Sequence, residues 1–118
     1  MREDVEVAYD DDLAHRIREL LVDEDGVSER PMFGGLSFLI GGHMAVAVSS
    51  KGGLLVRVGP DAYAQAIAHP DASEFVMRDR TMLGWVRVGP EGVRTKRKLS
   101  PWVRRGAAFA RTLPPKGR

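Results

Sequence analysis

Residues 27–58 read VSERPMFGGLSFLIGGHMAVAVSSKGGLLVRV, and most of the predicted strands lie within them. Short apolar runs alternate with glycine pairs, which supply the positive backbone φ that tight hairpin turns require. Strands joined by such short connections must be antiparallel, because a parallel return needs a long crossover. Pro31 cannot donate a ladder hydrogen bond, so the first strand is expected at an edge or a bulge. The stretch predicts four strands, over residues 27–33, 36–40, 43–49 and 54–58.

A helix is predicted ahead of these strands. Leucine and isoleucine recur at helical spacing between residues 10 and 25. Asp10 is a suitable N-cap for this helix. Gly26 is placed to end the helix in the left-handed conformation.

The second half of the sequence predicts two further helices and two further strands. Residues 60–68 form a short helical pattern that begins with a proline, and residues 74–78 and 84–88 form strand patterns. The last helix is predicted to begin at Ser100-Pro101, an N-cap followed by a proline in the first turn. The fold class is therefore α+β: a two-layer domain with an antiparallel sheet, helices on one face, and the order α-β(3-4)-α-β(2)-α.

A chain of 118 residues is expected to form one domain over residues 1–118, with flexible tails at 1–8 and 114–118. The N-terminus is acidic and has no apolar run, unlike a signal peptide. No apolar stretch approaches the roughly 20 residues that span a bilayer. We therefore expect a cytoplasmic protein that has no contact with a membrane.

The residue types that build most catalytic and metal sites are missing or wrongly spaced. The absence of cysteine excludes disulfides, thiolate zinc sites and iron–sulfur clusters. His15, His43 and His69 have no second ligand at metal-binding spacing. No Ser-His-Asp or paired-carboxylate arrangement can be assembled, and the successive βαβ units of a methyltransferase are missing. We predict no catalytic residue, no metal and no cofactor.

The charge of the chain is strongly polarised, although its formal net charge is only +2. Residues 1–29 hold eleven acidic residues against three arginines, whereas residues 30–118 hold fifteen basic residues against five acidic ones. Such asymmetry favours either an anionic partner for the basic end or pairing between two copies of the chain. Alternatively, the two ends neutralise each other within one molecule.

Basic residues concentrate near the C-terminus, where no acidic residue follows Arg94. Such a segment can hold nucleic-acid phosphates without reading their sequence. The alternative is a solvated helix face that follows a solubilising loop. The candidate anion or nucleic-acid patch comprises Arg94, Lys96, Arg97, Lys98, Arg104, Arg105 and Arg111.

A second candidate surface lies on the sheet. Strand alternation places Arg57, Trp85 and Arg87 together on the face that carries no helix. Tryptophan and arginine are enriched at protein interfaces, so these three residues form a candidate interaction surface. The alternative is that Trp85 packs within the molecule under the arginine stems.

Several ordered motifs are similar to a known family. Met32-Phe33-Gly34-Gly35 is followed by a hydrophobic strand, a glycine turn and Leu54-Leu55-Val56-Arg57-Val58. Met82-Leu83-Gly84-Trp85-Val86 and Pro101-Trp102-Val103 come later in the same order. Over residues 8–115 the sequence resembles the N-terminal domain of the TfoX/Sxy competence-regulator family.

The resemblance implies an α+β fold like that of type III secretion chaperones, which are commonly dimeric. The founding family members regulate DNA-uptake genes and carry a second, helical domain, whereas this sequence ends shortly after Pro115. The family offers no catalytic residues to carry over. We therefore expect a non-enzymatic regulatory or adaptor domain that contacts a protein partner or a second copy of itself. The alternative is a nucleic-acid-associated module that uses the basic C-terminal segment.

Overall fold

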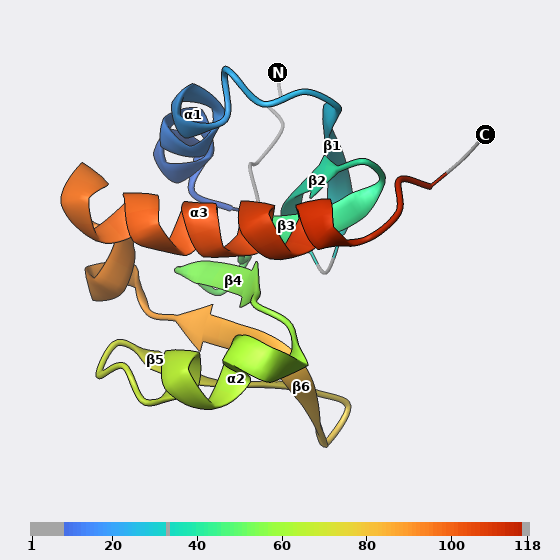
Figure 1. Cartoon of the computed structure of the whole chain (residues 1–118). Coiled ribbons are helices and arrows are strands. Elements are labelled where there is room, and N and C mark those ends of the chain that lie inside the picture. The colour runs from blue at the N-terminus through green and yellow to red at the C-terminus, as the bar shows by residue number, and fades with distance from the viewer. Residues whose placement is uncertain (1–8, 33, 117–118) are drawn as a thin grey trace.

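The computed structural model describes residues 9–32 and 34–116. These residues form a sheet of strands with helices packed against it, as Figure 1 shows. The predicted α+β class and the predicted order of helices and strands are confirmed. In chain order the elements are α1 (Asp11–Leu20), β1 (Val27–Met32), β2 (Gly35–Ile40), β3 (His43–Val48), β4 (Leu54–Arg57), α2 (Pro60–Ile67), β5 (Ala72–Met77), β6 (Arg80–Val88), the 3₁₀ helix η1 (Pro90–Val93) and α3 (Lys96–Thr112).

The six strands form one antiparallel sheet in the order β1-β2-β3-β4-β6-β5. Among the described residues β1 pairs only with β2, so the strand that contains Pro31 lies at the sheet edge, as predicted. At the other edge, the register of β5 against β6 shifts between Glu74 and Val76. The two edges of the sheet are therefore β1, which contains a proline, and β5, whose pairing is irregular.

All three helices pack on the same face of the sheet. The main core joins strand residues such as Phe38 and Val56 to Ile17 of α1, Ala66 of α2 and Leu99 of α3. In Figure 1, α3 crosses the sheet between α1 and α2. The other face of the sheet holds a smaller apolar cluster, whose described members are all strand residues.

Where the sequence has a glycine pair between two predicted strands, the structure has a hairpin turn. Gly41 and Gly42 adopt φ values of 61° and 86° in the β2–β3 turn, as a tight hairpin requires. The β5–β6 turn instead places Arg78 and Asp79 at φ values of 53° and 64°. β6 begins at Arg80, four residues before its predicted start, and no glycine marks this turn in the sequence.

The last helix begins earlier than predicted. α3 starts at Lys96, because the Thr95 hydroxyl caps the Lys98 amide at 3.2 Å and Leu99 is fully buried. Ser100 is not the N-cap, and Pro101 lies inside the helix. Proline at this position removes a single backbone donor near the start of a 17-residue helix, a loss that core burial offsets.

The first helix ends earlier than predicted. The Asp10 carboxylate caps the Leu13 amide at 3.1 Å, as expected, but α1 ends at Leu20 rather than near residue 25. Three consecutive acidic residues, 23–25, would lie at the negative end of the helix dipole if the helix continued. Gly26 does adopt a positive φ of 74°, in the turn before β1 and not at the helix end.

The segment after α3 lies against the β2–β3 turn. The His43 ring donates from Nε2 to the Pro114 carbonyl at 2.7 Å, and the Lys116 amide donates to the Gly41 carbonyl at 2.8 Å. Of the two predicted tails, residues 1–8 and 117–118 lie outside the described residues. Within the described ranges, no helix has the length and apolar character needed to cross a membrane.

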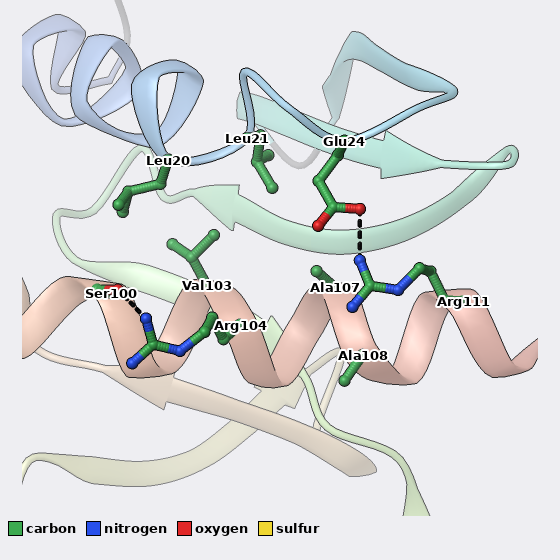
Figure 2. Close-up of a pocket in the computed structure, with 9 residues that line it drawn as sticks. All are labelled: Leu20, Leu21, Glu24, Ser100, Val103, Arg104, Ala107, Ala108 and Arg111. Atoms are coloured by element: carbon green, nitrogen blue, oxygen red, sulfur yellow. Dashed lines mark hydrogen bonds and ion pairs between the residues drawn. The ribbon is translucent and has the colours of Figure 1, made fainter.

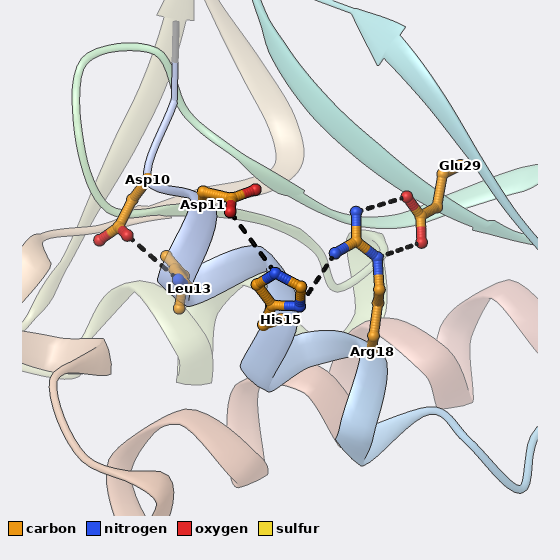
Figure 3. Close-up of polar contacts among 6 residues, drawn as sticks. All are labelled: Asp10, Asp11, Leu13, His15, Arg18 and Glu29. Carbon is orange, nitrogen blue, oxygen red and sulfur yellow. Dashed lines mark hydrogen bonds and ion pairs between the residues drawn. The ribbon is translucent and has the colours of Figure 1, made fainter. Parts of the chain in front are cut away.

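A line of polar contacts ties α1 to β1, as Figure 3 shows. His15 lies 3.5 Å from Asp11 and accepts a hydrogen bond from Arg18 at 3.4 Å. Arg18 in turn donates to both Glu29 oxygens, at 2.7 and 2.9 Å. These hydrogen bonds lower the pKa of Glu29 and raise that of Arg18. Both side chains are about a third exposed, so solvent screens the pair.

The Arg18–Glu29 pair gives a prediction about pH. Because the pKa of Glu29 is lowered in the folded state, the pair stabilises the fold above the ordinary carboxyl range. That contribution is lost as the pH falls through the folded-state pKa. Glu29→Gln is therefore expected to cost up to about 1 kcal/mol at neutral pH and almost nothing in strong acid. Urea unfolding of the variant and the wild type, from neutral pH to strong acid, measures this loss of free energy. Equal losses at both ends of the pH range, or the same profile in the strand control Glu74→Gln, would contradict the prediction.

Candidate interaction surfaces

The helix-free face of the sheet brings together the three predicted residues of the interaction surface. The β4–β6 register pairs Arg57 with Trp85 and Leu55 with Arg87, which places all four side chains on this face. The Arg57 guanidinium lies 5.4 Å from the centroid of the Trp85 ring. Arg87 donates to the Ser49 hydroxyl at 3.1 Å and to the Lys51 carbonyl at 3.3 Å, which ties it to the β3–β4 loop.

An apolar cluster lies beneath these residues. Met44, Ala47 and Leu55 are buried, and Met32, Phe75 and Trp85 pack against them while remaining partly exposed. The ring centroids of Phe75 and Trp85 are 6.3 Å apart. Trp85 thus packs within the molecule, which was the alternative interpretation, and still presents part of its ring to solvent beside two arginines.

Arg57 also contacts a helix residue that the sequence did not connect to this surface. Its guanidinium lies 5.3 Å from the Phe109 ring of α3, so it sits between two aromatic rings. Phe109 comes this close because Gly59 has no side chain: a Cβ there would lie 2.4 Å from the ring. Residues 57 and 109 are far apart in the sequence, and no local pattern signals their contact.

The seven basic residues of the predicted patch do not form one surface. Arg94, Lys96, Arg97 and Lys98 gather where α3 begins. Arg94 forms an ion pair with Glu91 at 3.4 Å, and Lys98 donates to the Glu91 carbonyl at 3.2 Å. Lys96 and Arg97 form no ion pair with any other residue that the structure describes.

Arg104 and Arg111 lie on the other side of α3, beside the end of α1. Figure 2 shows Arg104 directed along the helix toward Ser100 and Arg111 directed toward Glu24. Arg104 donates to the Ser100 hydroxyl at 2.6 Å, and Arg111 pairs with Glu24 of the acidic half of the chain. The two side chains border a groove of about 350 Å³. At this groove the acidic and basic halves of the chain meet within one molecule.

Arg105, the last of the seven, lies on the α2 side of α3. Its guanidinium is 4.7 Å from the centroid of the Trp102 ring, and the His69 ring meets the same tryptophan edge-on at 5.3 Å. Arg97, Lys98 and Arg105 line one hollow together with His69 and Asp71. The predicted patch therefore divides between the α1 groove and the start of α3, where Arg97 and Lys98 share this hollow with Arg105.

The Met32-Phe33-Gly34-Gly35 motif has a structural role where it is described. Met32 packs against the strand-only cluster, and Gly34 adopts a φ of 76° in the β1–β2 turn. A Cβ on Gly35 would lie 1.9 Å from the Val48 carbonyl oxygen. Phe33 lies outside the described residues.

A metal site is not evident in the described ranges, where no three histidine or acidic side chains gather closely enough to hold an ion. His15 and His69 each contact an aspartate, at 3.5 and 4.0 Å, whereas His43 bonds a backbone carbonyl. The histidines thus serve local contacts on separate elements.

A six-stranded antiparallel sheet that three helices cover on one face defines a small α+β domain. The family model described as the TfoX N-terminal domain matches residues 19–110. The chain belongs to the TfoX N-terminal domain family, which is a family of regulatory domains and not a known enzyme family. No curated protein and no solved structure matches the chain.

Proposed function

We propose that this protein is a non-enzymatic regulatory adaptor that acts through protein–protein contacts made by the helix-free face of its sheet. The observation that carries the proposal is the partly exposed Trp85 ring, held between Phe75 and Arg57. Buried tryptophan and arginine side chains dominate the binding energy of most protein interfaces. On this face both residue types surround an apolar floor.

The surface is also held in place before any partner binds. Stacking on two rings restricts the Arg57 guanidinium, and two hydrogen bonds restrict Arg87. A side chain that is already ordered loses less conformational entropy on binding, which leaves more of the contact energy as affinity. Arg57 forms no ion pair with a described residue, so a partner that combines an apolar side chain with a carboxylate suits the surface.

An affinity capture from native lysate tests the proposal. The wild-type domain is expected to retain a specific protein that resists nuclease treatment, and Trp85→Ala is expected to release most of it. Truncating an interface anchor of this kind commonly costs about 2 kcal/mol or more, roughly a thirtyfold loss of affinity. Arg78→Ala, at the β5–β6 turn, serves as the control and should retain the partner. Equal capture by wild type and Trp85→Ala would refute the proposal. A differently tagged copy of the chain in the lysate reveals whether the partner is a second copy.

A second candidate function is association with nucleic acid through the basic residues at the start of α3. The observation that favours it is the gathering of Arg94, Lys96, Arg97 and Lys98 at one place. Phosphate contacts release counterions, so such binding must weaken steeply as salt rises. The same capture tests this candidate. It would be favoured over the adaptor if nuclease treatment released the captured material and the double variant Arg97→Glu, Lys98→Glu failed to capture it.

A further inference from the structure

A hollow of about 250 Å³ opens between the start of α3 and the loop that joins α2 to β5. The first turns of α3 contribute Arg97, Lys98 and Arg105 to its lining. The loop contributes His69 and Asp71. None of these residues lies on the helix-free face of the sheet, so the hollow is independent of the proposed adaptor surface.

The lining of the hollow carries an excess of positive charge. The side chains of Arg97 and Arg105 form no hydrogen bond or ion pair with a described residue, and the Lys98 ammonium contacts only a backbone carbonyl. Asp71 is the one carboxylate among the lining residues, and its nearest oxygen lies 4.0 Å from His69 Nδ1. Three cationic groups therefore face one acidic group. The positive end of the α3 dipole lies beside Arg97 and Lys98 and adds to the attraction for an anion.

The aromatic ring in the lining of the hollow, that of Trp102, is already covered by other side chains. Arg105 covers Trp102 at 4.7 Å, the His69 ring makes a T-shaped contact with it, and the tryptophan is only 3% exposed. A nucleic-acid base needs an open aromatic face on which to stack, so base stacking cannot provide recognition here. The same stacking fixes the Arg105 guanidinium at the wall of the hollow.

We infer that this hollow binds a phosphate group through Arg97, Lys98 and Arg105. Arginine presents a planar fork of donors that matches phosphate oxygens, and lysine adds a point charge. The volume falls below the roughly 300–1,000 Å³ of sites that enclose drug-sized ligands. It suits a phosphate group whose attached remainder stays in solvent, on either a small phosphate ester or a nucleic-acid backbone.

A titration of the ¹⁵N-labelled protein with inorganic phosphate tests the inference, with the ionic strength held constant by sodium chloride. The Arg97 and Lys98 amides and the Trp102 indole are expected to shift and to saturate at millimolar phosphate. Arg97→Gln removes an exposed side chain without disturbing the core and should weaken binding roughly tenfold. Arg104→Gln, on the same helix but outside the hollow, should leave the affinity unchanged.

Asp71→Asn provides a variant that should gain affinity. It removes the one carboxylate of the lining. It keeps the hydrogen bond that the backbone amide of residue 71 donates to His69 Nδ1. Phosphate should bind severalfold more tightly, because the unfavourable charge contact is lost. Shifts that do not saturate, or that change equally in Arg97→Gln and Arg104→Gln, would overturn the phosphate site.

Two further probes distinguish the sources of the phosphate. Glycerol phosphate should match or exceed inorganic phosphate if the natural ligand is a small ester. A short single-stranded oligonucleotide should bind more tightly, with steep salt dependence and no sequence preference, if the ligand is a nucleic acid. In either case Arg97→Gln must weaken binding. These titrations use no protein partner, so their outcome is separate from the fate of the adaptor proposal.

Discussion

Gly35→Ala is expected to destabilise the protein by about 3 kcal/mol or more, or to prevent folding, which is several times the effect of a typical substitution. Gly35 begins β2, opposite Met32 of β1. An added Cβ would lie 1.9 Å from the Val48 carbonyl oxygen and 3.3 Å from the Ser50 amide nitrogen. Both contacts are to backbone atoms, which cannot rotate away as a side chain would. The steric clash can therefore be relieved only if strands β2 and β3 move apart.

Gly89→Ala is the matched control for this prediction. Gly89 has an ordinary φ of −65°, and a Cβ there would meet no atom within 4 Å. This substitution should be neutral or slightly stabilising, because alanine restricts the unfolded chain more than glycine does. Guanidinium unfolding of both variants measures the difference. Similar midpoints for Gly35→Ala and wild type would show that β2 and β3 do not approach as described.

Gly106→Ala is expected to lower the free energy of unfolding by about 2 kcal/mol, which reverses the usual sign of this exchange in a helix. Alanine normally stabilises a helix interior by about 1 kcal/mol relative to glycine. Gly106, however, lies directly against β3. An added Cβ would lie 2.4 Å from the Ala45 carbonyl oxygen and 2.9 Å from a Val46 methyl group. The helix would have to move away from the sheet and lose contacts with the main core.

Ala108→Gly provides the complementary measurement on the same helix. Ala108 is exposed, so this change should cost about 1 kcal/mol through helix propensity alone. If Gly106→Ala proved stabilising while Ala108→Gly was destabilising, propensity would govern both positions. The close approach of α3 to the sheet would then be wrong.

The strands were predictable wherever glycine marks a turn. The Gly41-Gly42 pair and the glycines before Leu54 identify the β2–β3 and β3–β4 hairpins without any tertiary information. The Arg78-Asp79 turn carries no such mark, and the early part of β6 was missed for that reason. The start of α3 was misplaced because Ser100-Pro101 imitates a helix start, whereas the true cap at Thr95 is stabilised by the burial of Leu99.

The candidate surfaces were predictable only in part, for a similar reason. Strand alternation correctly placed Arg57, Trp85 and Arg87 on one face, because a period of two is a local property. The contribution of Phe109 depends on how closely α3 approaches Gly59, which no local pattern contains. Likewise, the basic residues of α3 divide between two sides of the helix, according to which of them face α1 and which face the α2–β5 loop.

The two edges of the sheet affect how readily the protein aggregates through the addition of further strands. An open sheet offers unpaired backbone groups at its rims, and these can recruit further strands into aggregates. Here Pro31 removes a donor from one rim, and the register shift beside Val76 twists the other. Strand addition is hindered on both sides. Concentrated solutions of the domain should therefore resist fibril growth.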